Sequence, residues 1–257
     1  MKVVLFCGGQ GLRLRDVSET TPKPMVKVGY RPIIWHVMKY YAQHGHKDFI
    51  LCLGHKAEMI KEYFLNYDEC ASNNFTMRNG GKRIELSSCD IEDWTITFVD
   101  TGLNTLIGQR LKAVQPYLRG EEMFLANYSD NLTDCHLSEL IGAFADQPDK
   151  AAAFLCVRPS QSFHVVETNG NHEVFGIKDC RKANIWINGG YFVFRQAIFD
   201  YIQPGEELVN EVFQRLIGEN RLMAYRYEGF WACMDTFKEH QQLEEMYAGG
   251  HAVWKIW

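Results

Sequence analysis

A glycine-rich segment stands directly behind a short apolar run near the start of the chain. Phe6 and Cys7 end that run, and Gly8-Gly9-Gln10-Gly11-Leu12-Arg13 follows. Glycines in such a position let backbone amides approach an anion because no Cβ stands in the way. The spacing is neither G-x-G-x-x-G nor G-x-x-x-x-G-K-[ST], which disfavours a dinucleotide site and a P-loop. The segment alone fits a phosphate cradle or a plain turn from a strand to a helix.

Two cations close to the glycines favour the phosphate cradle. Arg13 lies two residues past Gly11, and Lys23 lies between two prolines in Thr21-Pro22-Lys23-Pro24-Met25. In phosphoryl and nucleotidyl transfer the protein mostly positions groups and neutralises charge, so a rigid Arg and Lys beside a cradle suit that chemistry. A solvated basic surface is the alternative explanation.

An alternation of strands and helices indicates how these residues are positioned. Continuous apolar runs at 3–7 and 49–53 predict strands buried on both faces. Apolar spacing predicts helices at 33–44, where Gly45 is the stop signal, and at 57–67. This order is typical of a right-handed parallel α/β unit. The first strand is therefore expected to be central, with the glycine segment directly after it.

Further elements continue this pattern. We expect strands at 94–99, 122–128 and 151–157, helices at 110–118, 137–145, 207–217 and 236–247, and strand material broken by two glycines at 185–194. Residues 75–88 are expected to form an extended insertion or hairpin, and 165–178 alternate like a hairpin around Asn169-Gly170-Asn171. No linker or repeat interrupts residues 1–257, so we expect a single domain.

Charge and composition exclude several classes of protein. A formal net charge of -5 over 257 residues argues against a protein that grips nucleic acid or an anionic membrane. No stretch of about 18 apolar residues and no signal peptide is found, so a soluble, cytoplasmic protein is expected. The eight cysteines are scattered without metal or C-x-x-C spacing, which predicts reduced and mostly buried thiols.

Ordered motifs along the whole chain resemble one family. G-G-x-G-x-R-L followed by P-K-P-M is similar to the signature of the sugar-1-phosphate nucleotidyltransferases, and the chain most resembles their glucose-1-phosphate cytidylyltransferase branch. The matching segments continue in order through Pro32-Ile33-Ile34-Trp35-His36, Ile60-Lys61-Glu62-Tyr63-Phe64, Val99-Asp100-Thr101-Gly102, Ile187-Asn188-Gly189-Gly190 and Gly229-Phe230-Trp231 with Met234-Asp235-Thr236.

The resemblance implies a fold and a reaction. The fold would be a single-domain Rossmann-like, GT-A-type three-layer sandwich with a mostly parallel central sheet and a small hairpin insertion, in a homo-oligomer. The reaction would join CTP, or another nucleoside triphosphate, to a phosphorylated small molecule such as a sugar 1-phosphate and release pyrophosphate. The acceptor oxygen would attack the α-phosphorus in line, so no protein nucleophile is needed.

The resemblance also assigns the nucleotide side of the site. Backbone from Phe6 through Cys7 and Gly8 to Gly9 would receive the base and ribose, and the loop Gln10-Gly11-Leu12-Arg13, together with Lys23, would hold the phosphates. Thr105, Arg110 and Ser129 match positions near the nucleotide, and Ser129 stands where the family usually has glycine. A helix surface charge is the alternative for Arg110.

Two aspartates match the family's magnesium ligands. Asp130 follows an expected strand and Asp235 lies in Met234-Asp235-Thr236, and their separation in sequence would not pair them. A hard cation between phosphates needs one or two carboxylates and otherwise keeps its waters. Mg2+ would bridge the α-phosphate and the incoming oxygen and lower their repulsion. Surface or capping aspartates are the alternative.

The acceptor side departs from the family pattern. Lys178-Asp179-Cys180-Arg181-Lys182 stands where the family has Glu-Lys-Pro, and His164 replaces a glycine. Lys178, Arg181 or Lys182 would still hold a phosphate, Asp179 is the displaced carboxylate, and Asn188 lies in the strand behind them. We therefore hypothesise a conserved triphosphate half-reaction with an acceptor other than glucose 1-phosphate.

Other classes remain open at this point. A non-catalytic nucleotide or nucleotide-sugar binder is compatible with the altered acceptor side. A nucleotide-sugar glycosyltransferase is disfavoured because Asp130-Asn131-Leu132 is not D-x-D, and a Rossmann dehydrogenase is disfavoured because the third fingerprint glycine is absent.

Overall fold

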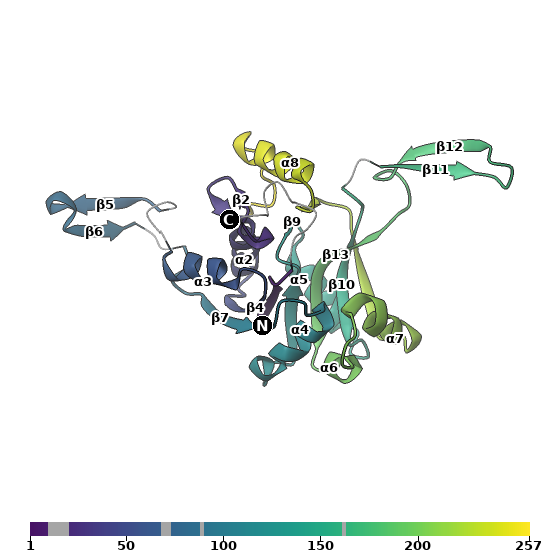
Figure 1. Cartoon of the computed structure of the whole chain (residues 1–257), viewed down its shortest axis with the longest axis horizontal. Helices are drawn as coiled ribbons and strands as arrows, with labels where there is room; N and C mark the ends of the chain where they lie inside the picture. The colour runs from purple at the N-terminus through teal and green to yellow at the C-terminus, as the bar shows by residue number, and fades with distance from the viewer. Residues whose placement is uncertain (10–20, 68–72, 88–89, 161–162) are drawn as a thin grey trace.

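A seven-stranded sheet forms the centre of the computed structural model, which describes residues 1–9, 21–67, 73–87, 90–160 and 163–257 (Figure 1). Every neighbouring pair of strands is parallel except the two pairs that involve β13, which runs antiparallel to β8 and β10. The mostly parallel α/β sheet predicted from the sequence is confirmed. In spatial order the strands are β14 (Leu222–Tyr227), β10 (Ala152–Val157), β13 (Ile187–Arg195), β8 (Met123–Asn127), β1 (Val3–Phe6), β4 (Asp48–Leu53) and β7 (Thr95–Asp100).

Helices cover both faces of the sheet and enclose two apolar cores. On β1, Val3 and Leu5 point into one core and Val4 and Phe6 into the other, as alternation along a strand requires. This arrangement is the three-layer sandwich expected from the sequence. One core takes side chains from α2 (Ile33–Gln43), α3 (Ala57–Leu65), α5 (Leu137–Ala145) and α8 (Phe237–Ala248). The other takes them from α4 (Ile107–Val114), the turn η5 (Gln115–Leu118), α6 (Ile198–Tyr201), the π-helix η6 (Leu208–Val212) and α7 (Phe213–Gly218).

Short elements gather at the edge of the sheet where the parallel strands end. Strand β9 (Asn131–Thr133) follows β8 and pairs antiparallel with β15 (Trp231–Cys233), which precedes α8. The 3-10 turn η2 (Lys23–Met25) leads into the strand pair β2 (Lys27–Val28) and β3 (Arg31–Pro32). Neither β9 nor β15 was expected from the sequence, because three residues are too few to show a period.

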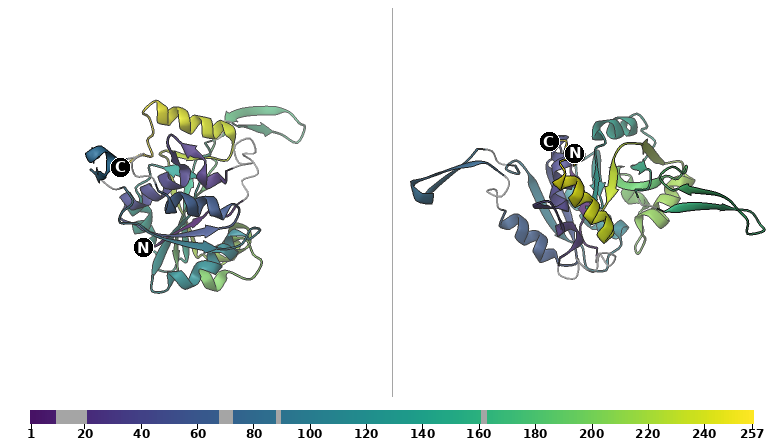
Figure 2. Two further views of the ribbon diagram at one scale, coloured as in Figure 1. Left: turned by 60° about the vertical axis from the view of Figure 1, so that its left-hand side comes forward. Right: turned by 90° about the horizontal axis from the view of Figure 1, so that it is seen from above.

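Two hairpins project from opposite ends of the body (Figures 1 and 2). One consists of β5 (Phe75–Arg78), the 3-10 turn η4 (Asn79–Gly81) and β6 (Arg83–Leu86), and the other of β11 (His164–Thr168) and β12 (Val174–Asp179). Both hairpins were predicted. Each exposes large apolar side chains, among them Met77 on the first and Phe175 on the second.

The structure corrects one strand and adds another. The strand expected to be broken by glycines is continuous as β13, and its pairing with β10 skips from Phe154↔Phe192 to Cys156↔Asn188. Gly189 and Gly190 therefore sit in a bulge, and Gly190 has a φ of +76°. Strand β14 (Leu-Met-Ala-Tyr-Arg-Tyr) was missed; it lies at the sheet edge, and none of its residues is fully buried. In the part of the chain that the structure describes, no helix is long and apolar enough to span a membrane.

Candidate active site

Lys23 joins the two aspartates that the sequence resemblance singled out. Its Nζ donates to Asp130 Oδ2 at 2.5 Å and also to Asp235 Oδ1. The three side chains are partly buried, with exposed fractions of 13% for Lys23, 17% for Asp130 and 35% for Asp235. Two carboxylates that come from distant parts of the sequence thus face one point.

The strand pair β9–β15 brings the two acids together. Asn131 pairs with Cys233, and the Met234 N–H donates to the Asp130 carbonyl at 3.1 Å. Asp130 and Asp235 therefore lie at the same end of a short antiparallel ladder. The Asp235 N–H is held in turn by Glu239 Oε2, 2.9 Å away on the first turn of α8. Hydrogen bonds therefore hold the backbone of both Asp130 and Asp235 in place.

Burial and charge act in opposite directions at this cluster. Burial raises the pKa of Asp130 above its ordinary value, although the Lys23 ammonium acts to lower it. Burial acts to lower the pKa of Lys23, but the attraction of Asp130 and Asp235 outweighs it, so that pKa is raised. Lys23 therefore stays charged at neutral pH and neutralises part of the acidic charge.

The donor set fits magnesium. Two carboxylate oxygens converge on a position that a cation, the Lys23 ammonium, already contacts. Among the residues that the structure describes, no group of three or more His, Cys, Asp and Glu side chains could hold a metal. Mg2+ commonly uses one or two carboxylates together with substrate phosphates and water, whereas structural zinc needs four protein ligands. Asp130 and Asp235 are thus the candidate ligands.

Arg110 lies beneath the glycine segment and not on the helix surface. Its guanidinium donates to the Gly8 carbonyl at 3.1 Å, to the Leu53 carbonyl at 3.1 Å and to Thr101 Oγ1 at 2.6 Å, as well as to the Leu103 carbonyl. Only 2% of the residue is exposed. One side chain therefore ties together the segments that follow β1, β4 and β7.

Glycines make room for this guanidinium. A Cβ on Gly8 would come 2.0 Å from Arg110 Nη1, and a Cβ on Gly54 would come 2.8 Å from the Gly8 carbonyl oxygen. Gly102 has a φ of +92°, and a Cβ there would approach Thr105 Oγ1 to 2.7 Å. Gly9 is exposed and its Cβ position is open. Gly8 is thus a packing glycine, while Gly9 faces solvent.

Ser129 ties the end of β8 to the end of β1. Its Oγ donates to the Phe6 carbonyl at 2.9 Å, and its N–H donates to Asn127 Oδ1 at 2.8 Å. Its φ is +67°, in the left-handed region that favours glycine. The serine keeps the backbone shape that a glycine allows and adds a cross-strand hydrogen bond. Next to it, Asn188 Nδ2 donates weakly to Tyr128 Oη at 3.4 Å.

Some of the other residues expected on the nucleotide side are described by the structure, and some are not. Gln10, Gly11, Leu12 and Arg13 are outside the described residues. Cys7 is fully buried, and burial raises the pKa of its thiol to about 12, so it acts as a packing residue. All the cysteines that the structure describes are buried, and none of them forms a disulfide.

The expected acceptor residues lie at the base of the β11–β12 hairpin. His164 pairs with Asp179 across the two strands, and the Asp179 carboxylate is bound by Arg181. Lys178 is exposed and pairs with Glu167 at 2.9 Å. His164, Asp179 and Arg181 thus form one cluster, whereas Lys178 contacts Glu167. The observed contacts do not join this cluster to Asp130 or Asp235.

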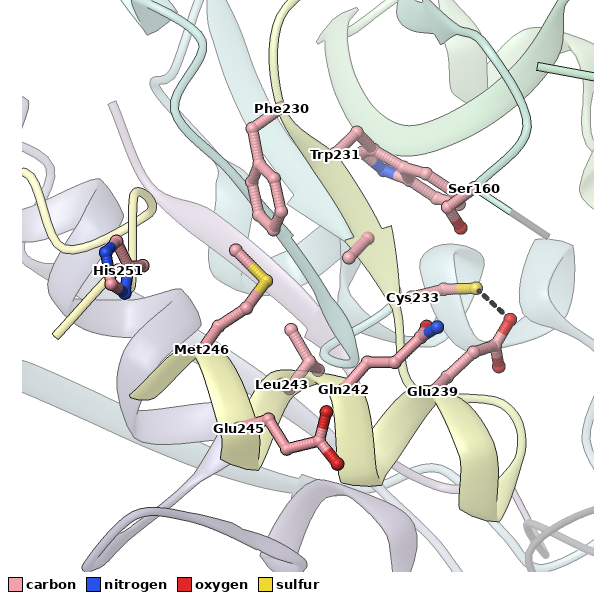
Figure 3. Close-up of a pocket in the computed structure, with 11 residues that line it drawn as sticks. Ser160, Phe230, Trp231, Cys233, Glu239, Gln242, Leu243, Glu245, Met246 and His251 are labelled. Carbon is pink, nitrogen blue, oxygen red and sulfur yellow. Dashed lines mark hydrogen bonds between the residues drawn. The ribbon is translucent and has the colours of Figure 1, made fainter. Parts of the chain in front are cut away.

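A cavity of about 520 Å³ lies between β15 and α8 (Figure 3). Phe230, Leu243 and Met246 supply apolar surface, and Glu239 and Gln242 supply polar groups. Glu239 connects this cavity to the acids, because it accepts from the Asp235 N–H and also contacts Cys233 Sγ at 3.5 Å. The described residues that line the cavity include two glutamates and no Lys or Arg, so this lining suits a neutral polar group better than a phosphate.

The sequence interpretation missed Glu239, although a signal for it existed. Thr236 and Glu239 form a capping box at the start of α8, and the T-x-x-E spacing is visible in the sequence. The same glutamate fixes the backbone of Asp235, a role that no spacing reveals.

The geometry defines an α/β protein whose charged site lies at the carboxyl ends of parallel strands, where ligands of such sheets bind. Residues 2–245 match the family model described as Nucleotidyl transferase. The chain belongs to this family. It is 36% identical over 259 residues to the probable glucose-1-phosphate cytidylyltransferase of Bacillus subtilis (strain 168) and to the glucose-1-phosphate cytidylyltransferase of Salmonella typhimurium, with 100% of both chains covered in each case.

Solved structures share the fold. The UTP-bound UGPase from Acinetobacter baumannii aligns with a TM-score of 0.70 at 19% identity, covering 97% of this chain and 94% of the other. HddC from Yersinia pseudotuberculosis aligns with a TM-score of 0.68 at 18% identity, covering 96% and 99%. These likenesses confirm the predicted GT-A-type architecture.

Proposed function

We propose that this protein transfers the cytidylyl group of CTP to a phosphorylated small molecule, of which a sugar 1-phosphate is the first candidate, and releases pyrophosphate. The observation that carries the proposal is the convergence of Asp130, Asp235 and Lys23 at the carboxyl edge of the sheet. The full-length similarity to two glucose-1-phosphate cytidylyltransferases favours CTP as the donor. Such a reaction, with its supply of CTP, fits a cytoplasmic protein.

The residues of the chain would contribute position and charge. Asp130 and Asp235 would hold Mg2+, which when bound polarises the α-phosphate and draws the two phosphates together. Lys23 would neutralise charge on the phosphates, and Arg13 would do the same from the glycine loop. Arg110 and Ser129 would act as positioning residues, because they fix the Gly8 and Phe6 carbonyls behind the nucleotide. The acceptor phosphate oxygen would attack the α-phosphorus without a protein nucleophile.

The acceptor is expected to differ from glucose 1-phosphate. Lys178 and Asp179 are engaged by Glu167 and Arg181 at the base of a projecting hairpin, and neither reaches the acids through an observed contact. His164, Arg181 and Asn188 are the further candidates for acceptor contacts. The cavity beside Asp235 would take the uncharged part of the acceptor.

Pyrophosphate release tests this proposal. CTP, UTP, dTTP and GTP are each supplied with Mg2+ and with glucose 1-phosphate, other sugar phosphates, polyol phosphates or phosphorylated amino acids. CTP with one acceptor should give the highest kcat/KM. Asp130→Asn and Asp235→Asn should each lower it by about 100-fold or more, while Asp146→Asn, at the exposed end of α5, should not. Full activity in both site variants would exclude Asp130 and Asp235 as metal ligands. If glucose 1-phosphate proved to be the best acceptor, the expectation of another acceptor would be wrong.

We further propose that the protein is a homo-oligomer in which the two hairpins dock on other copies of the chain. A two-stranded hairpin alone is only marginally stable in water, and here Phe175 is 70% and Ile177 is 63% exposed on one hairpin and Met77 is 61% exposed on the other. Light scattering should show a multimer. Phe175→Ser combined with Ile177→Ser should raise the monomer fraction, and Leu65→Ser at the end of α3, equally apolar and exposed, should not. A monomeric wild type would contradict this proposal.

A further inference from the structure

The Lys23 ammonium occupies the space between the two acids. It contacts Asp130 Oδ2 at 2.5 Å and Asp235 Oδ1 as well. Mg2+ binds carboxylate oxygens at about 2.0–2.1 Å. An ion bound to the same two oxygens would need the position of the ammonium. Lys23 and the metal therefore compete for one place.

The backbones on both sides of this contact are fixed. Asp130 and Asp235 are held by the β9–β15 ladder and by the Met234 N–H bond to the Asp130 carbonyl. Lys23 lies in a 3-10 turn between two prolines, closed by the Met25 N–H to the Pro22 carbonyl at 2.8 Å and the Val26 N–H to the Lys23 carbonyl at 3.1 Å. Lys23 can therefore leave the acids by rotation of its side chain, without any movement of the backbone.

Leaving requires another anion. The Lys23 side chain is only 13% exposed, and a buried ammonium without a partner is costly. A dication next to an undisplaced ammonium would also be repelled. The phosphates of a nucleoside triphosphate at the same edge would receive the ammonium and supply further metal ligands. The metal alone supplies no anion that could pair with the displaced Lys23 ammonium.

We infer that Lys23 is a place-holder for the metal, so that the empty enzyme binds a divalent cation weakly and takes it up together with the triphosphate. This inference rests on the proposed function, because it uses Asp130 and Asp235 as metal ligands. It adds an order of binding: the triphosphate draws Lys23 away from the acids and opens the metal position. By linkage, the metal and the triphosphate must strengthen each other's binding by the same factor.

Binding of Mn2+ alone, without any nucleotide, tests the inference. Free Mn2+ is measured by electron paramagnetic resonance during titration of the full chain. Lys23→Met should bind Mn2+ at least about tenfold more tightly than the wild type, which corresponds to about 1.4 kcal/mol. Lys27→Met removes the same charge from an exposed strand four residues away and should bind Mn2+ as the wild type does. Adding Asp235→Asn to Lys23→Met should remove the gain.

A second variant covers the case in which Lys23→Met does not fold. Lys23→Gln keeps a hydrogen-bond donor for the acids without the charge, and it too should bind Mn2+ more tightly than the wild type. Thermal unfolding gives an independent readout, in which Mn2+ alone should raise the Tm of either Lys23 variant more than that of the wild type. Wild-type affinity for Mn2+ equal to that of both variants would overturn the inference.

The outcomes separate this inference from the proposed function. Pyrophosphate release by the wild type, with no gain of Mn2+ affinity in the Lys23 variants, would overturn the place-holder alone. A gain of Mn2+ affinity in the variants, with no pyrophosphate release by the wild type from any triphosphate, would support the place-holder and overturn the proposed reaction.

Discussion

Arg110 Nη1 lies so close to Gly8 that a Cβ on residue 8 would come within 2.0 Å of it. Because the guanidinium is buried and bound to backbone on three segments, it cannot shift without losing hydrogen bonds. We expect Gly8→Ala to destabilise the protein by about 1–3 kcal/mol, as overpacking does. Urea unfolding measures this cost, and the KM for the triphosphate should rise in the same variant.

The neighbouring glycine provides the control. Among the residues that the structure describes, no heavy atom lies within 4 Å of a Cβ on Gly9, so Gly9→Ala should unfold like the wild type. Equal stability of the two alanine variants would contradict the packing role of Gly8. The sequence interpretation treated both glycines as parts of an anion cradle, since a partner that arrives from residue 110 leaves no trace in local spacing.

Two features of Ser129 have opposite effects on stability. Its left-handed backbone is unfavourable for a residue with a side chain, and its hydrogen bond to the Phe6 carbonyl is favourable. Ser129→Ala removes the bond to the Phe6 carbonyl but keeps the φ of +67°, so it should lose about 1 kcal/mol. Ser129→Gly loses the same bond but relieves the backbone, and its stability should lie closer to that of the wild type. Thermal unfolding of both variants measures the difference. A glycine variant less stable than the alanine variant would show that the backbone at residue 129 is not strained.

His36 is held neutral inside the protein. Its Nε2 contacts the Val28 carbonyl at 2.9 Å, and the Trp254 Nε1–H donates to its Nδ1 at 3.4 Å. Nδ1 therefore accepts, and Nε2 carries the only ring proton. Burial lowers the pKa of His36 from 6.5 to about 4. The stability that follows from this shift is fully present above pH 6.5 and is lost as the pH falls from 6.5 to about 4.

Unfolding at two pH values tests this expectation. Between pH 8 and pH 5 the shift of His36 should cost about 2 kcal/mol of unfolding free energy. His36→Gln should flatten that part of the dependence, whereas His172→Gln on the exposed hairpin should leave it unchanged. His44 and His46, whose pKa values burial also lowers, remain in both variants and supply the residual slope. If the unfolding free energy depended on pH identically in the wild type and in His36→Gln, His36 would not be the source of this pH dependence.

Glu239 both caps α8 and holds the Asp235 N–H. Thr236→Ala removes the side-chain cap and the hydroxyl bond to Glu239 but leaves the Asp235 N–H bond to Glu239 in place, so it should cost about 1 kcal/mol with little change in kcat. Glu239→Ala should cost a similar amount of stability and also lower kcat, because Asp235 loses its anchor. Steady-state pyrophosphate release and urea unfolding on the two variants separate the roles. Equal kcat values would mean that Asp235 is positioned by β15 alone.

The fold was predictable because its signals are local. The buried run at β1, the helical spacing of α2 and α5 and the turn residues of the β11–β12 hairpin each lie within a few residues. Strand β13 was judged broken because its two glycines, read singly, mark a stop, whereas in the sheet they form a bulge against β10.

The site was less predictable because its contacts are distant in sequence. Lys23 and Asp235 are 212 residues apart, and only family resemblance suggested that Asp235 belongs with Asp130. The buried position of Arg110 also depends on three segments at once. Periodicity reports which face of an element is buried, but it does not report which side chains from other elements meet there.

The reversed direction of β13 has a consequence for how this enzyme can change. Strand β10 ends at the edge of the sheet that carries the acids, and β13, running the other way, begins at that edge. The chain between them, residues 158–186, therefore leaves and re-enters the sheet at one edge and carries the β11–β12 hairpin. Because this segment contains no strand of the seven-stranded sheet and neither aspartate, we expect changes in it to leave the strand register and both acids in place. Under the proposed function, in which this segment contacts the acceptor, exchanging the segment would change the acceptor and leave the nucleotide side as it is.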